Sequence, residues 1–171
     1  MKTRSLRSRL SFSYAVLALL LVALLSLCIN VLFQVQFKNY VVRQQQERSR
    51  EVVSLLEKQY TSEGWNARAI ESVGVNALEQ GMILKLRNPD GTVVWDATVH
   101  NSGLCVQMLS HMASNMTSHY PNFQGGYEQA EYPVAVFGKK VGTAAIGYYG
   151  PYYFTDNDIA FLNGLNAVLL I

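Results

Sequence analysis

The segment from Leu104 to His119 carries several side chains that bind soft metal ions, at helical spacing. On a helix with 100° between residues, five of them share about 80° of arc. These are Cys105, Met108, Met112, Met116 and His119, with His111 to one side. Thioether, thiolate and imidazole ligands on one face suit Cu(I) or another soft cation. The alternative is that methionines at helical spacing fill an irregular core, and the sequence favours this packing role.

A second group of side chains has the composition of a small-molecule pocket, which needs apolar walls and a few polar tips. Its candidate members are Trp95, Asp96, Tyr127, Tyr132 and Tyr148, with Tyr149 beside the last. Trp95 and Asp96 are neighbours on an expected strand, so they face opposite sides of the sheet. We expect Trp95 in the core and Asp96 as a solvated charge, and a ligand pocket is the alternative.

The patterns of familiar catalytic sites are missing from the sequence. It contains no Ser/His/Asp order, no H-E-x-x-H pair and no phosphate-binding loop. The nearest approach to a carboxylate pair, Glu128 and Glu131, falls in a charged turn or strand start. We therefore predict no catalytic residue and no cofactor in this chain. A hydrolase would need folding to bring a nucleophile and a base together.

The elements that position these groups begin with an apolar segment. Leu10 to Phe37 contains no Asp, Glu, Lys or Arg. Its part from Ser11 to Phe33 would be roughly 35 Å long as a helix, which matches a hydrocarbon core of about 30 Å. We expect a cytoplasmic basic tail over residues 1–10 and a transmembrane helix over 11–37. A cleaved signal peptide is the alternative, although the segment is long and no A-x-A pattern closes it.

The distribution of charged residues gives only weak evidence on the orientation of the chain and on its partners. Four basic residues precede the apolar segment and four follow it closely, so a cytoplasmic N-terminus depends on the tighter N-terminal cluster. Residues 38–154 are long enough for one domain with its own core. The slightly longer stretch from Lys38 to Asp158 holds ten basic and twelve acidic residues, and this slightly acidic balance argues against a nucleic-acid partner. Of two cysteines, Cys28 lies in the apolar segment, so no disulfide framework is expected.

The hydrophobic pattern predicts an α+β domain, with a small antiparallel sheet and helices on one side. The first helix should continue to residue 60, and a second should span 65–80. A hairpin is expected from 82–88 and 92–99 around Asn88-Pro89-Asp90-Gly91, then a helix over 104–119 and strands over 127–137 and 141–149. A seam on the first helix either forms a weak dimer contact or packs on its own domain; its residues are Val42, Gln45, Ser49, Val52 and Leu56.

The C-terminal segment 155–171 resembles the beginning of another membrane crossing. Thr155 and Asp158 can cap a helix that is apolar from Ile159 to Ile171. The YYGPYYF cluster before it is typical of a membrane interface. We expect a second transmembrane helix, cut short. If this segment is instead a buried helix, the chain would be an anchored or secreted binding protein.

The layout resembles the N-terminal input half of a bacterial membrane-bound two-component sensor histidine kinase. GMILKLRNPDGTVVWDA resembles the first sheet hairpin of the PAS-like (PDC/Cache-like) extracytoplasmic sensors of that family. EYPVAVFGKKVGTAAIGYY resembles the closing strand pair, which leads into the second transmembrane helix. Chemoreceptors share the layout, so an anchored ligand-binding or chemoreceptor-type protein without kinase output is the alternative.

The resemblance implies a sensing module in the bacterial cell membrane, with residues 38–154 extracytoplasmic. Its expected partners are the lipid bilayer, a second copy of the chain, an unknown small ligand, and a response regulator reached through domains beyond this chain. No kinase activity is expected here, because His100, His111 and His119 lack the residues that follow a phosphoacceptor histidine. ATP and Mg²⁺ would bind only the kinase core of the parent protein.

Overall fold

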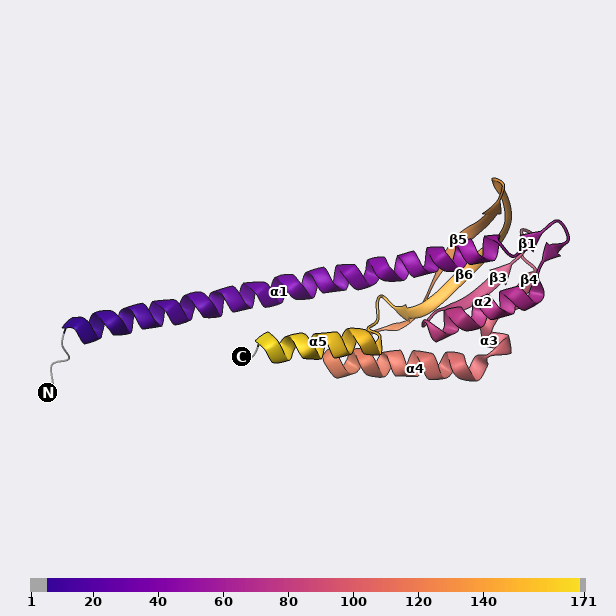
Figure 1. The fold of residues 1–171 in the computed structure, drawn as a ribbon. Coiled ribbons are helices and arrows are strands. Elements are labelled where there is room, and N and C mark those ends of the chain that lie inside the picture. The colour runs from indigo at the N-terminus through magenta and orange to yellow at the C-terminus, as the bar shows by residue number, and fades with distance from the viewer. Residues whose placement is uncertain (1–5, 170–171) are drawn as a thin grey trace.

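The computed structural model describes residues 6–169 and is drawn in Figure 1. Helix α1 (Leu6–Glu57) is a single helix of 52 residues. It contains no Gly or Pro, so nothing in the sequence interrupts its backbone hydrogen bonds. In Figure 1 its N-terminal part extends away from the rest of the molecule, whereas its C-terminal part lies along the sheet. The helix ends three residues before the expected boundary at residue 60.

Among the described residues, α1 is the one helix that is long and apolar enough to cross a membrane, judged by length and composition. Its most apolar window has a mean hydropathy of 2.9, and none of that window is buried. Exposed apolar surface costs roughly 25 cal/mol per Å² in water. This part of α1 therefore presents a continuous apolar surface that the domain does not cover.

The seam on α1 packs against its own domain. Ser49, Val52 and Leu56 are 1%, 4% and 0% exposed. The Ser49 hydroxyl donates to the sulfur of Met82 at 3.8 Å, and the Ala135 amide donates to the Glu57 carboxylate at 3.2 Å. Of the two expected alternatives, the structure shows packing within one chain. A dimer contact through α1 would use a different face of the helix.

A four-stranded antiparallel sheet, in the order β4-β3-β6-β5, lies at the centre of the domain. The strands are β3 (Ile83–Arg87), β4 (Val93–Asp96), β5 (Gly126–Val136) and β6 (Lys139–Gly150). The predicted turn joins β3 to β4, with Gly91 at a φ of +87° that favours glycine. A small hairpin, β1 (Tyr60–Thr61) and β2 (Gly64–Trp65), forms between the first two expected helices, where no strand was predicted.

Strand β4 is shorter than the expected strand over 92–99. The Asp96 carboxylate accepts hydrogen bonds from the Thr98 amide at 2.9 Å and the Thr98 hydroxyl at 2.6 Å. Asp96 thereby caps the short helix α3 (Ala97–His100). A side chain that satisfies the first helical amides favours a helix over a continued strand. The chain then continues into α4 (Ser102–His119), close to the expected helix.

Helices α1 and α2 (Ala67–Glu79) cover one face of the sheet, and α2 lies over β3 and β4. Gly74 of α2 lies directly against the indole ring of Trp95, where a Cβ atom would overlap the ring. The side chains that fill this core are fully buried, among them Leu56, Ile70, Leu84, Leu86 and Ile146. We call this group the sheet core. The expected α+β class, a small antiparallel sheet flanked by helices, is confirmed.

Helix α5 (Asp156–Leu169) begins with the predicted cap. The Thr155 amide and hydroxyl donate to Asp158 Oδ2 at 2.9 and 2.7 Å, and the Asp158 amide donates to the Thr155 hydroxyl at 3.3 Å. This is the reciprocal arrangement of a capping box. In Figure 1, α5 (yellow) lies beside α4 and α1. It leaves the domain on the same side as the apolar part of α1, and the two helices run in opposite directions.

Candidate functional site

A second core lies where α1, α4, α5 and the end of β6 meet, and we call it the junction core. It is rich in aromatic and methionine side chains and comprises Phe37, Val41, Met112, Met116, Tyr149, Tyr153, Phe154 and Leu162. The Tyr153 hydroxyl donates to the Gln80 carbonyl at 3.0 Å, and burial raises its pKa. The Phe154 amide donates to the sulfur of Met116 at 3.2 Å. The connector from β6 to α5 is therefore fixed to both α2 and α4.

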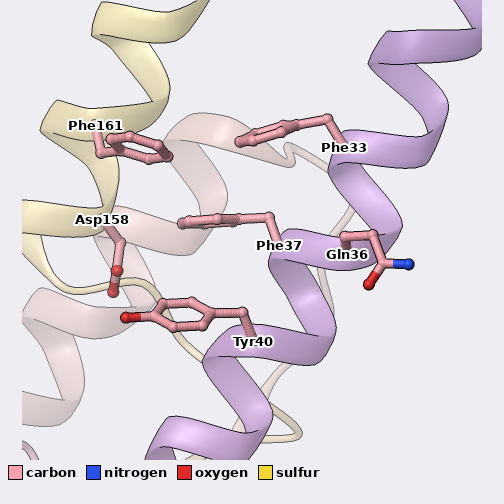
Figure 2. Close-up of a pocket in the computed structure, with 6 residues that line it drawn as sticks. All are labelled: Phe33, Gln36, Phe37, Tyr40, Asp158 and Phe161. Atoms are coloured by element: carbon pink, nitrogen blue, oxygen red, sulfur yellow. The ribbon is translucent and has the colours of Figure 1, made fainter.

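The end of the junction core nearest the apolar part of α1 is shown in Figure 2. Phe33, Phe37 and Tyr40 project from α1 towards α5, and Phe161 projects back towards them. The Phe161 ring centroid lies 5.9 Å from that of Phe37 and 6.2 Å from that of Phe33. Their spacing of four and three residues places the three α1 rings on one helix face. These contacts join α1 directly to α5.

A cavity of about 430 Å³ lies between the two helices at this point. It is lined by Phe33, Gln36, Phe37, Tyr40, Asp158 and Phe161. Its walls are mostly aromatic, and Asp158 supplies the one ionisable carboxylate among these lining residues. We call it the aromatic cavity. An arrangement of apolar walls with few polar groups is that of a small-molecule site.

A more polar cavity of about 580 Å³ is bounded by α1, α2, α4 and the start of α5. Its charged lining includes Arg48, Glu79 and Asp156. Asn115 Nδ2 donates to Asp156 Oδ1 at 2.7 Å, and His111 Nε2 lies 2.8 Å from the same oxygen. The hydrogen bonds of Asn115 and His111 lower the pKa of Asp156. These bonds tie α4 to the first turn of α5.

The five residues predicted for a ligand pocket are divided between the two faces of the sheet. Trp95 and Tyr132 occupy one cross-strand row, and Tyr148 lies on the same face by two-residue alternation. Asp96 and Tyr127 lie on the opposite face, where burial raises the pKa of Tyr127. The sheet therefore separates Trp95, Tyr132 and Tyr148 from the other two, and the set does not converge on one pocket.

The prediction for Trp95 agrees with the structure, whereas the prediction for Asp96 does not. Trp95 is a core residue, 5% exposed, as predicted. Asp96 is only 4% exposed, so its expected role as a solvated charge is wrong. Lys85 lies opposite it in the register and places Nζ 2.6 Å from Asp96 Oδ2. Burial alone would raise the pKa of Asp96, but hydrogen bonds from Lys85 and Thr98 outweigh it and hold the pKa below its usual value.

The five predicted metal ligands follow α4 over most of its length. Cys105 and His119 are 14 residues apart in one helix, which is about 21 Å, so they cannot bind the same ion. Cys105 belongs to the sheet core and donates to the Ala97 carbonyl at 3.5 Å. Met112 and Met116 are buried in the junction core, with Met108 half-buried beside both cores. Within residues 6–169, no three His, Cys, Asp or Glu side chains are grouped for a metal.

The aromatic residues of the junction were not expected as a site. Phe33 and Phe37 fall inside the predicted transmembrane helix, where an apolar ring indicates lipid contact. The available signal is their spacing with Tyr40 at the end of the apolar segment, together with the aromatic cluster before α5. The two clusters come from opposite ends of the sequence, and their meeting is a long-range contact that local spacing does not predict.

Comparison with known proteins identifies the family. No curated protein matches the chain. A family model described as a Cache-like sensory domain of BaeS type matches residues 5–148. The matched region includes all of α1 and the sheet up to Tyr148 in β6. The chain therefore belongs to the Cache-like sensory domains of BaeS type.

Proposed function

We propose that this chain is the extracytoplasmic input module of a transmembrane sensor histidine kinase. In this proposal α1 crosses the membrane from a cytoplasmic basic tail, residues 38–154 lie outside the cytoplasm, and α5 begins a second crossing. A ligand or an envelope condition favours one of two packings of the domain. A kinase core beyond this chain binds ATP and Mg²⁺ and phosphorylates a response regulator. Family membership and the exposed apolar part of α1 support this proposal.

The observation that carries the proposal is the direct packing of α5 on α1. Phe161 of α5 contacts the rings of Phe33 and Phe37 on α1. At its other end α5 is held by the bonds of Asp156 to α4 and by the buried connector residue Phe154. A rearrangement of the domain that moves this connector therefore changes the position of α5 relative to α1. Small helix shifts of this kind are a common means of signalling.

A homodimer completes the proposal, because a two-helix shift in one copy has to be read by a paired kinase core. The seam of α1 is occupied by its own domain, so the dimer contact falls on the solvent-facing side of the helix. Glu47, Arg50 and Leu55 are exposed there. Cysteine pairs introduced at these positions should cross-link two copies of the full-length parent in membranes.

The test of coupling uses the full-length parent protein in liposomes, with autophosphorylation by ATP as the readout. Phe161→Ala removes the ring that joins α5 to α1 and leaves the sheet untouched. An aromatic pair stabilises its arrangement enough to change the balance of two states about two- to tenfold, so basal phosphorylation should change by that factor. Phe137→Ala is the matched control, because Phe137 is fully exposed on the turn between β5 and β6. Phosphorylation equal to that of the wild type in the Phe161 variant would contradict the coupling.

The orientation is tested with cysteine labelling in intact cells. Lys139→Cys places a thiol at the exposed first residue of β6, beside the β5–β6 turn, and Ser8→Cys places one in the basic tail. A membrane-impermeant maleimide should label the first variant directly and the second only after permeabilisation. The reverse pattern would overturn the proposed orientation.

A further inference from the structure

We propose that the aromatic cavity binds an organic ammonium compound with an apolar tail, taken from the membrane. This deepens the proposed function by naming a ligand class, and it rests on that function for the position of α1 in a bilayer. Binding itself is measurable without any kinase readout.

The walls of the cavity suit a cation. Four rings line it, from Phe33, Phe37 and Tyr40 on α1 and Phe161 on α5. Their centroids are spaced so that Phe37 lies 5.7 Å from Phe33, 6.2 Å from Tyr40 and 5.9 Å from Phe161. An ammonium group is attracted to a ring within about 6 Å of its centroid, and substituted ammonium ions are bound by such groups of rings. Because neighbouring rings are this close to each other, a cation bound against one of them from the cavity would lie near a second ring.

The carboxylate of Asp158 supplies the opposite charge. Figure 2 shows it directed from α5 into the cavity, near the level of Tyr40. Both of its hydrogen bonds from Thr155 use Oδ2, so among the described residues Oδ1 is left to accept from a ligand. Since the capping bonds already hold the side chain in place, binding requires little reordering of Asp158.

Polarity along the cavity matches that of an amphiphile in a membrane leaflet. Phe33 lies towards the exposed apolar part of α1, whereas Tyr40 and Asp158 lie on the side of the domain. Phe33 and Tyr40 are seven residues apart on α1, which is about 10 Å along the axis. Phe161 and Tyr40 are 54% and 55% exposed, so the cavity is open for entry. A head group beside Asp158 would leave its tail pointing into the bilayer.

Two basic side chains, Lys38 and Arg48, lie near the cavity. Lys38 lies on another face of α1, with Nζ 4.8 Å from the centre of the Tyr152 ring. Arg48 and Asp158 line a separate cavity of about 10 Å³. Within the described part of the chain they are not within ion-pair distance of each other. Among residues 6–169 Asp158 forms no ion pair, so an anionic head group beside it would meet an unneutralised carboxylate, and anions are disfavoured.

The experiment uses the full chain in uncharged maltoside micelles. The probe is dodecyltrimethylammonium with a photoreactive diazirine in its tail, and cross-linked peptides are identified by mass spectrometry. We expect labelling to concentrate on residues 33–40 and 158–161. Unlabelled dodecyltrimethylammonium should compete, and dodecyl sulfate should not. Competition by phosphatidylethanolamine assigns the site to a lipid head group, and its failure to compete assigns the site to a foreign amphiphile.

Two pairs of variants give the controls. Asp158→Asn keeps an oxygen for the Thr155 cap but removes the charge, so labelling should fall about fivefold, as expected for the loss of a charged partner. Asp156→Asn makes the same charge change on the same helical turn, outside the cavity, and should leave labelling unchanged. Phe161→Ala should reduce labelling about threefold through the lost ring, whereas Phe137→Ala should not.

Equal labelling of the two aspartate variants would overturn the proposal, and so would competition by dodecyl sulfate as effective as that by the cation. Specific labelling in a protein whose kinase ignores Phe161→Ala would retain the ammonium site and remove the proposed coupling. The two failures are therefore distinguishable.

Discussion

The sheet core and the junction core differ in how their side chains are held. Ile70, Leu84, Leu86 and Ile146 of the sheet core are each fully buried, and three of them lie on hydrogen-bonded strands. The junction core consists mainly of aromatic rings and methionines from α1, α4, α5 and the connector before α5, with Tyr149 from the end of β6. Close-packed interiors resist displacement, whereas flexible methionine side chains adapt to it. The sheet is a fixed platform, and the junction is the part able to change its packing.

The backbone hydrogen bonds of the two cores support the same distinction. Strand β6 pairs with β5 along its length and with β3 from Thr143 to Gly147, which fixes the platform in register. In the junction, the Phe154 amide donates to a thioether sulfur, which is a weak acceptor. Regions with fewer strong backbone bonds open at lower free energy. We therefore expect changes in the sheet core to affect stability and changes in the junction to affect signalling.

The largest expected effect is that of Leu84→Ala in the sheet core. Leu84 is 0% exposed, and removing its side chain should lower the free energy of unfolding by about 3 kcal/mol, because strand neighbours cannot collapse into the space. Chemical denaturation in mild detergent measures this. Leu104→Ala, at a residue 51% exposed, is the control and should cost little. A loss below about 1 kcal/mol for Leu84 would show that the sheet core is as adaptable as the junction.

Asp96→Asn comes next, because it removes the buried charge of the ion pair with the half-buried Lys85. The expected loss at pH 7 is about 2 kcal/mol, typical of a hydrogen bond to a charged group. The pKa of Asp96 is lowered by folding, so this stabilisation is present above the unfolded pKa of about 3.9 and is lost as pH falls through the folded pKa. Unfolding followed from pH 7 to pH 3 should therefore show a flatter pH dependence in the variant.

Glu131→Gln is the matched control for Asp96. Glu131 pairs with Arg87 at 3.4 Å, but its side chain is 55% exposed. Exposed pairs contribute about 0–1 kcal/mol, so this variant should be nearly neutral. Equal losses for the two variants would mean that burial does not distinguish the two ion pairs.

Met116→Leu tests how adaptable the junction core is. Leucine has a similar volume but cannot accept the bond from the Phe154 amide, and the expected loss of stability is about 1 kcal/mol. Basal kinase activity of the full-length parent should change, since Phe154 precedes α5. The reciprocal exchange Leu86→Met, in the sheet core, should leave that activity unchanged. If Leu86→Met alters activity and Met116→Leu does not, the assignment of the two regions is reversed.

The smallest expected effect is that of His111→Ala on stability. His111 and Asp156 are 59% and 73% exposed, so their contact should contribute at most about 0.5 kcal/mol. Because the hydrogen bonds of Asn115 and His111 lower the pKa of Asp156, their contribution is lost as pH falls through the folded pKa of that carboxylate. Thermal unfolding at pH 7 and pH 3.5 measures both. Asn115→Ala should cost more than His111→Ala, since Asn115 is half-buried and is the larger cause of the shift.

Local chemistry explains what was predictable from the sequence. The turn at Asn88 to Gly91 and the cap of Thr155 with Asp158 depend on residues close in sequence, and both form as predicted. The end of β4 was missed because Asp96 acts as a helix cap, which competes with a favourable strand pattern. Helical spacing places Cys105 and His119 on one face of α4, but the two residues lie too far apart along the helix axis to bind one ion.

The aromatic cavity could not be predicted, because it depends on contacts between distant parts of the chain. Phe33 and Phe161 are separated by 128 residues, and no local pattern states that their rings meet. The division of the predicted pocket residues between two sheet faces depends in the same way on register. Register is set by the pairing of β6 with both β3 and β5, which no single strand encodes.

Because α1 is one unbroken helix, it can act as a lever arm with its pivot at Phe37. The section from residue 10 to 32 stands clear of the domain, and its length of about 34 Å multiplies any change of angle at the pivot. A tilt of about 5° at the rings moves the far end by about 3 Å, since a helix rises 1.5 Å per residue without bending freely. A displacement of a few tenths of an ångström between two rings thus becomes a movement large enough for another protein to read.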